Sequence, residues 1–364
     1  MKILQVIPDL NAVGGAENFV LQLSASLQES GQDVTILSLY PKNNDFFDNF
    51  IETNNLNVLY LNKKRGIDFK TARELIRTIK KINPDVIHGH LRFHLTLMLS
   101  GKYKIKNIPF VETFHQNYAV ASENKILKKY MSKSYNNKNI IPVAISDQVK
   151  VTAARYFNIN EQIPVIYNGI KIQKVSSNKP INYRKNEFIT VSRLYPVKNH
   201  YLMIDAIDQL IKKGYSPELT IIGDGELFFE LKKMIKEKKL EKNIFLIGEK
   251  KNVFDYLLTH KYFLLPSFSE GNPISLLEAM SCGLVPIVTK IGGTIDIVNN
   301  ENGYLIDPYD VSTLVSAMEY VIKNPGKNEL FSKINFEKSK KFEISVTAKE
   351  YLELYKNLMK GILE

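Results

Sequence analysis

Two cations follow a short apolar run in the second half of the chain. Arg193 and Lys198 lie five residues apart, just past the predicted strand 188–191. A guanidinium group can fork onto phosphate oxygens and a lysine adds a point charge, so the pair suits one diphosphate. The alternative is two solvated surface cations. Their place at the carboxyl end of a predicted strand favours the phosphate site.

A short helix is predicted within residues 267–283. Asn272 suits the N-cap, Pro273 suits the first helical position, and Gly283 suits the C-terminal stop. The free N–H groups at the start of such a helix favour an anion. The residues that open this helix are therefore candidates to hold a polar ligand.

Two carboxylates belong to this segment, one before the predicted helix and one inside it. Glu270 precedes the helix and Glu278 lies inside it. Eight residues span about 12 Å if helical, against ~5–10 Å for a glycosidase pair. We therefore expect separate roles, with Glu270 facing a reacting sugar and Glu278 accepting ribose hydroxyls. The alternative is two solvated glutamates, which the apolar, small-residue surroundings disfavour.

Two glycine turns follow predicted strands. Gly14 and Gly15 come after the strand 2–7, and Gly223-Asp224-Gly225 follows the strand 219–222. Without side chains, these backbones can approach a ligand closely, and a helix N-terminus favours an anion. Neither turn matches the dinucleotide-binding pattern GxGxxG, and each alone could be an ordinary strand–helix turn.

Three histidines lie at predicted strand ends, namely His88, His90 and His115. A single histidine in such a place is more often structural than catalytic. A metal held by His88 and His90 is disfavoured because no cysteine or acidic cluster accompanies them. No Asp-x-Asp occurs in the chain. We therefore expect no metal and no separate cofactor.

The elements that must position these residues alternate between strands and amphipathic helices, which is typical of parallel α/β sheets. We expect two doubly wound, Rossmann-like domains that face each other across a cleft, with the strand C-termini opening into it. The expected boundaries are 1–170 for the first domain, 171–186 for a linker, 187–345 for the second domain, and 346–364 for a final helix that crosses back.

Composition limits the class of protein. The 364 residues have an average apolar fraction, one cysteine (Cys282) and no apolar run long enough to span a membrane, so we expect a cytoplasmic protein. The formal charge of +11 is densest over 102–138. No aromatic platform accompanies this basic patch, which argues against nucleic acid. A basic amphipathic helix within 125–138 instead suits an anionic membrane surface.

Taken together and in this order, these motifs resemble the retaining glycosyltransferases of family 4, the group-1 class with the GT-B fold. The resemblance extends over about 1–325 and is strongest from Glu270 to Gly283. It implies an N-terminal acceptor domain, a C-terminal nucleotide-sugar domain, and metal-independent transfer with retention at the anomeric carbon.

The resemblance also implies roles for individual residues. His115 and Glu270 are implied to be catalytic, and Gly14 and His90 to lie on the acceptor side. The remaining implied roles are diphosphate binding by Arg193, Lys198 and Gly15, nucleotide and ribose binding by Glu278, Gly223 and Asp224, and donor-sugar binding by Gly271, Asn272, Pro273 and Ile274.

The function that we expect is transfer of a hexose or N-acetylhexosamine from a nucleotide-sugar, with UDP favoured, to a hydroxyl of a glycan. A lipid-linked acceptor in bacterial surface-polysaccharide synthesis fits the basic patch. The alternatives are a sugar-nucleotide epimerase of the same fold and a non-catalytic partner subunit of another transferase. The sequence does not indicate an oligomeric state.

Overall fold

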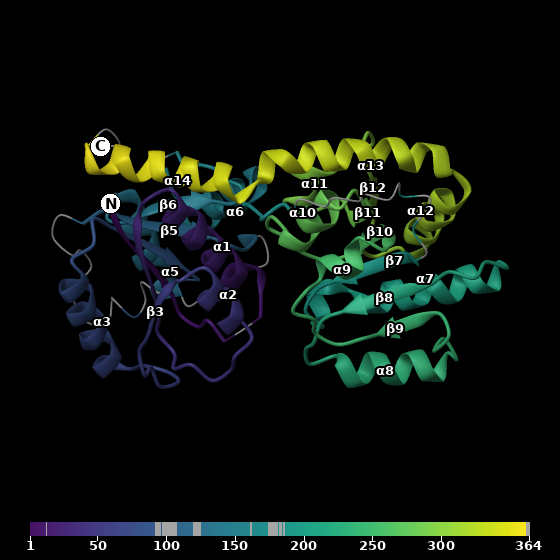
Figure 1. Cartoon of the computed structure of the whole chain (residues 1–364), viewed down its shortest axis with the longest axis horizontal. Helices are drawn as coiled ribbons and strands as arrows, with labels where there is room; N and C mark the ends of the chain where they lie inside the picture. The colour runs from purple at the N-terminus through teal and green to yellow at the C-terminus, as the bar shows by residue number, and fades with distance from the viewer. Residues whose placement is uncertain are drawn as a thin grey trace. The chain divides into compact units, whose positions relative to one another are not determined.

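The computed structural model divides the chain into two compact units (Figure 1). The first unit is Met1–Lys171 with Glu343–Glu364, and the second is Ile172–Phe342. The structure describes residues 1–11, 13–91, 96, 108–118, 125–160, 162–173, 181, 184 and 186–361. Of the predicted linker 171–186, residues 174–180, 182, 183 and 185 therefore lie outside the described residues, as do Lys102, Lys104 and Lys106 of the basic patch.

The first unit is built on a parallel sheet in the order β3-β2-β1-β4-β5-β6. The described strands are β1 Lys2–Ile7, β2 Asp33–Ser38, β3 Asn57–Tyr60, β4 Val86–His90, β5 Phe110–Phe114 and β6 Ile141–Ala144. The inner strands β1, β4 and β5 are buried along almost their whole length. Such continuous burial is typical of a parallel sheet whose faces are both covered by helices.

Helices accompany this sheet, and two of them start at a side-chain cap. The helices are α1 Gly15–Glu29, α2 Asp48–Thr53, α3 Phe69–Ile82, α5 Lys125–Asn136, α6 Asp147–Phe157 and α14 Ile344–Met359. The Asp68 carboxylate accepts a hydrogen bond from the Thr71 N–H at the start of α3, and Ser146 caps α6 in the same way through Val149. Each helix then ends at an asparagine with positive φ, Asn83 or Asn158.

The second unit repeats this architecture with the strand order β12-β11-β10-β7-β8-β9. Its strands are β7 Asn186–Val191, β8 Leu219–Ile222, β9 Ile244–Leu246, β10 His260–Leu265, β11 Val285–Thr289 and β12 Tyr304–Ile306. Its helices are η3 Pro196–Lys198, α7 His200–Lys212, α8 Phe228–Glu237, α9 Phe254–Leu257, α10 Ile274–Ser281, α11 Thr294–Ile297, α12 Val311–Lys323, α13 Pro325–Ser339 and η4 Lys340–Phe342. The expected doubly wound α/β class is confirmed.

One long helix of the second unit, α13, has no counterpart among the expected elements. Its buried face holds Asn328, Asn335 and Ser339 beside Phe331. The Asn335 amide donates to the carbonyl oxygens of Leu284 and Asn302, at 3.0 and 2.8 Å. Because polar side chains fill the inward face, the helix lacks the apolar period that reveals a helix in a sequence.

No helix in the described part of the chain has the length and apolar character needed to cross a membrane.

The last helix, α14, belongs to the first unit and packs against α1 (Figure 1). Tyr351 and Tyr355 on this helix are fully buried. The Tyr355 hydroxyl lies 2.6 Å from His88 Nδ1, and the Tyr351 hydroxyl lies 2.7 Å from the Thr113 hydroxyl. The end of the chain thus contacts β4 and β5 through buried hydrogen bonds.

We expect Tyr355→Phe to lower the free energy of unfolding of the first unit by about 1–3 kcal/mol. The variant keeps the ring but leaves a buried nitrogen of His88 without its partner. Hydrogen exchange of the β4 and β5 amides measures the change.

The control for this variant is Tyr309→Phe in the second unit, where the ring is 82% exposed. Equal protection of β4 and β5 in wild type and Tyr355→Phe would contradict the stabilising role of this hydrogen bond.

Candidate active site

The loop after β7 carries both predicted phosphate-binding cations, and its backbone is held in place by neighbouring loops. Asn199 has a φ of 55°, and its buried side-chain amide donates to the carbonyl oxygens of Pro266 and Pro308 at 3.2 and 2.9 Å. The Phe268 N–H donates to the Val197 carbonyl at 2.8 Å. The loop after β7 is therefore fixed to the loop after β10.

The first consequence of this attachment is an ion pair between two predicted site residues. The Lys198 Nζ lies 2.7 Å from Glu270 Oε1, and the two side chains are only 19% and 7% exposed. Lys198 is predicted from the sequence to contact the diphosphate, and Glu270 to contact the sugar. The ion pair brings the predicted diphosphate-binding residue into contact with the predicted sugar-binding residue. The Glu270 carboxylate thereby fixes the position of the Lys198 ammonium group.

Arg193 lies in the same loop and is exposed. Its guanidinium carbon lies 5.2 Å from the centre of the Tyr195 ring, which supports one face of the group. Among the residues that the structure describes, no carboxylate forms an ion pair with Arg193. Its N–H donors therefore remain available to a phosphate.

The glycine turn after β8 lies directly against this loop. Gly223 has a φ of 144°, and a Cβ atom there would come 1.9 Å from the Ser192 carbonyl oxygen. The Leu194 N–H donates to the Asp224 carbonyl at 2.9 Å. Glycine is required because the two backbones touch. Gly223 and Asp224 are thus brought next to the loop of Arg193.

The predicted start of the helix in 267–283 is wrong by one residue. The helix α10 begins at Ile274, and its N-cap is Pro273, with φ −73° and ψ 115°. The extended conformation of Pro273 keeps Asn272 outside the cap position. Gly283 ends the helix with a φ of 72°, as expected. The four predicted sugar-binding residues, 271–274, are all buried.

Glu278 lies inside α10, in an environment that differs from that of Glu270. It is buried, and burial raises its pKa to about 7. Glu270 is instead neutralised by Lys198. One carboxylate is thus paired with a lysine and the other has a pKa raised by burial, a difference that suits the separate roles expected from their spacing.

In the first unit, the turn Gly14–Gly15 forms the start of α1. Gly14 is the N-cap residue in an extended conformation, with φ −145°, and Gly15 is the first helical residue. A Cβ atom on Gly14 would lie 2.5 Å from a carboxylate oxygen of Glu17, which is buried in the first turn. The Glu17 carboxylate therefore lies against the backbone at this helix N-terminus, where an anion was expected to approach.

The three histidines of the first unit form a buried polar cluster. His88 Nε2 lies 2.7 Å from the Thr113 hydroxyl, and His90 Nδ1 lies 2.9 Å from His115 Nε2. His90 Nε2 lies 2.8 Å from Gln5 Oε1. Both ring nitrogens of His88 and of His90 are therefore occupied by protein groups.

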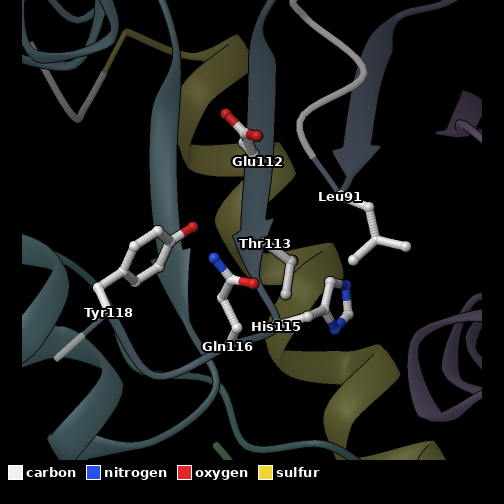
Figure 2. A pocket seen from close by; sticks show the side chains of 6 residues that line it. All are labelled: Leu91, Glu112, Thr113, His115, Gln116 and Tyr118. Atoms are coloured by element: carbon white, nitrogen blue, oxygen red, sulfur yellow. The ribbon is translucent and has the colours of Figure 1, made fainter. Parts of the chain in front are cut away.

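A cavity of about 200 Å³ opens beside this cluster (Figure 2). Its lining residues are Leu91, Glu112, Thr113, His115, Gln116 and Tyr118. The Glu112 carboxylate is 1% exposed and accepts a hydrogen bond of 2.9 Å from Tyr135. His115 was predicted from the sequence, whereas Glu112, Gln116 and Tyr118 were not. The available signal was that Glu112 lies within β5 and that the other two lie in the loop that follows it.

The raised pKa of Glu278 predicts how stability depends on pH. The folded second unit holds this proton more tightly than the unfolded chain, whose carboxyl has a pKa near 4.5. The free energy of unfolding should therefore fall by about 3 kcal/mol as pH rises from about 4.5 to about 7. Glu278→Gln should remove this fall, as urea titrations at several pH values would measure.

The control is Glu241→Gln, an exposed position in the same unit. The difference in stability between wild type and Glu278→Gln should change sharply over this pH range, while that for Glu241→Gln stays constant. A constant difference for Glu278→Gln would show that this carboxyl is not held protonated.

Two models of known protein families match this chain. The model of "Glycosyl transferases group 1" matches residues 171–338, and that of "Glycosyltransferase Family 4" matches residues 13–174. A relative from Staphylococcus aureus, named capsular polysaccharide biosynthesis glycosyltransferase CapH, is 28% identical and covers 85% of this chain and 86% of its own.

A second relative, from Escherichia coli, is 26% identical over 69% of this chain and 70% of its own. Its name is UDP-Gal:alpha-D-GlcNAc-diphosphoundecaprenol alpha-1,3-galactosyltransferase. Among solved structures, the Anabaena protein HepE in complex with UDP-glucose has a TM-score of 0.83 at 19% identity, covering 98% of this chain and 100% of its own. A glycosyltransferase from Rickettsia africae has a TM-score of 0.82 at 21% identity, covering 99% and 98%.

The two family models thus match different halves of the chain, and both describe glycosyltransferases. The chain belongs to the family-4, group-1 glycosyltransferases, which have the GT-B fold.

Proposed function

We propose that this glycosyltransferase is metal-independent and retaining. It transfers a hexose or N-acetylhexosamine from a UDP-sugar to a hydroxyl of a lipid-linked glycan in bacterial surface-polysaccharide synthesis. The observation that carries the proposal is the Lys198–Glu270 ion pair in the same loop as the exposed guanidinium of Arg193.

Charge explains why this arrangement suits transfer. Departure of a nucleoside diphosphate builds negative charge on the phosphate oxygens. Arg193 and Lys198 are placed to stabilise that charge without a metal ion, because Glu270 already holds Lys198 in position. Glu270 has further oxygen lone pairs for sugar hydroxyls, and Glu278 in α10 offers a carboxylate to the ribose.

The proposed reaction breaks the bond between the anomeric carbon and the diphosphate oxygen and forms a bond from that carbon to the acceptor oxygen. The acceptor attacks from the face that the leaving group occupied, so the configuration is retained. The proton of the acceptor hydroxyl passes to the leaving phosphate. The retaining outcome rests on the family to which the chain belongs.

Two relatives support the choice of substrates. The name of the Escherichia coli relative gives UDP-Gal as its donor and a GlcNAc-diphosphoundecaprenol acceptor. The HepE structure holds UDP-glucose. A UDP-sugar and a lipid-linked glycan are the corresponding proposals for this chain.

The test is calorimetric binding of UDP, GDP and ADP without added metal. UDP should bind, and Arg193→Ala should weaken that binding about 10- to 100-fold, since a charge-assisted contact contributes about 1.5–3 kcal/mol. Arg73→Ala, an exposed arginine on α3 of the first unit, is the matched control and should bind UDP like wild type.

An assay of sugar turnover, run beside the calorimetry, separates the rival functions. Binding of UDP-sugar with interconversion of the sugar, and no transfer to any acceptor, would identify an epimerase. Binding without turnover would identify a non-catalytic partner subunit. Failure of all three nucleotides to bind the folded protein would contradict the diphosphate site.

We also propose that the protein associates peripherally with an anionic membrane on the cytoplasmic side. The helix α5, expected from sequence, is present at Lys125–Asn136. Its apolar side is occupied, because Met131 and Tyr135 pack into the core of the first unit. The outward residues are Lys125, Ile126, Lys129 and Lys133. Attachment would therefore be electrostatic rather than by burial of an apolar face.

Co-sedimentation with vesicles containing phosphatidylglycerol tests this surface. Lys129→Glu with Lys133→Glu should weaken binding at least tenfold, since each basic residue near an anionic surface contributes about 1 kcal/mol. Lys232→Glu with Lys236→Glu on α8 makes the same charge change in the second unit and should have little effect. Equal loss in both variants would point to net charge rather than α5.

A further inference from the structure

A line of three side chains crosses the buried face of the first sheet and ends at the cavity. Gln5 on β1 contacts His90 on β4, and His90 contacts His115 after β5. Phe19 of α1 packs edge-on against both histidine rings, at 6.2 and 5.6 Å between ring centres. Gln5 and His90 are completely buried, so water does not share these contacts.

Both histidines are neutral near neutral pH. Burial lowers the pKa of His90 well below its ordinary value and that of His115 to about 3. A neutral imidazole carries one N–H and one acceptor nitrogen. The direction of each hydrogen bond in the line is therefore determined once the direction of one is known.

The orientation of the Gln5 amide sets that direction. Its Oε1 faces His90 and can only accept, so the His90 Nε2 at 2.8 Å carries the proton, while the buried amide nitrogen of Gln5 forms no hydrogen bond within the described residues. The Nδ1 of His90 is then an acceptor, and His115 Nε2 donates to it across 2.9 Å. The proton of His115 is thus on Nε2, which leaves Nδ1 as an acceptor. Among the residues that the structure describes, none hydrogen-bonds to this Nδ1.

We propose that Gln5 and His90 are positioning residues that hold His115 in its Nε2–H form, so that Nδ1 accepts a hydrogen bond from a sugar hydroxyl. The role of the sugar rests on the proposed function, whereas the protonation pattern does not. His115 lies on the wall of the cavity beside Thr113 and Gln116 (Figure 2). The site would therefore select a sugar whose hydroxyl can donate a hydrogen bond to His115 Nδ1.

Replacing Gln5 should reverse the direction of the hydrogen bond between His90 and His115. In Gln5→Met the buried Nε2–H of His90 would have no acceptor, which costs more than an unfilled acceptor nitrogen. His90 would therefore move its proton to Nδ1 and donate to His115 Nε2. His115 would then carry its proton on Nδ1 and present a donor where wild type presents an acceptor.

Long-range ¹H–¹⁵N correlation spectra of the full-length protein, labelled at histidine, test this directly. Protonated and unprotonated ring nitrogens resonate in separate ranges, and His115→Asn identifies the signals of His115. Wild type should show the Nε2–H form of His115, and Gln5→Met should show the Nδ1–H form. The opposite form in wild type, or an unchanged form in Gln5→Met, would overturn the proposal.

Gln22→Met is the matched control. Gln22 is a buried glutamine of α1 that also makes two hydrogen bonds, to Asn18 and to the Lys171 N–H, but it does not contact a histidine. This variant should keep the wild-type spectrum and kcat/KM, while Gln5→Met lowers kcat/KM for the UDP-sugar about tenfold. Absence of transfer in every form would reject the proposed function and leave the spectroscopic result standing.

Discussion

Burial of ionisable side chains at the carboxyl ends of parallel strands is the constraint on which both units depend. A buried polar group without a partner costs about 1–3 kcal/mol, and a buried charge costs more. In the second unit Lys198 and Glu270 meet this cost by pairing at 2.7 Å. In the first unit His88 and His90 avoid this cost because they stay neutral and because both ring nitrogens of each are within hydrogen-bond distance of protein groups. The same contacts that satisfy these groups also orient them.

The two units solve this problem with different chemistry. The second unit collects positive charge and backbone N–H groups, since the loop after β7 carries the exposed Arg193 and the paired Lys198, and α10 starts close to Glu270. Such an arrangement favours an anionic leaving group. The first unit removes charge from its histidines by burial and keeps only directional hydrogen bonds. Such an arrangement favours neutral, hydroxyl-rich ligands, which agrees with a sugar-binding role.

The last helix, α14, supports the histidine cluster of the first unit. After η4 of the second unit, the chain returns at Glu343 to the first unit, where α14 places Tyr351 and Tyr355 under the histidine cluster. The C-terminal residues are thus part of the interior that supports His115. Their sequence showed an amphipathic helix, but the hydroxyl groups that contact His88 and Thr113 are invisible to periodicity.

The sequence by itself determined the doubly wound α/β class, the strand ends that carry Arg193, Lys198 and His115, and the glycines that allow close backbone contacts. These follow from local patterns, because apolar period, turn residues and caps act over a few positions. Only the tertiary structure decided that Lys198 pairs with Glu270, that Gln5 meets His90 across 85 residues of sequence, and that α13 exists. Those outcomes depend on which strands are neighbours in a sheet and on how polar groups are satisfied when buried, and neither is encoded in local spacing.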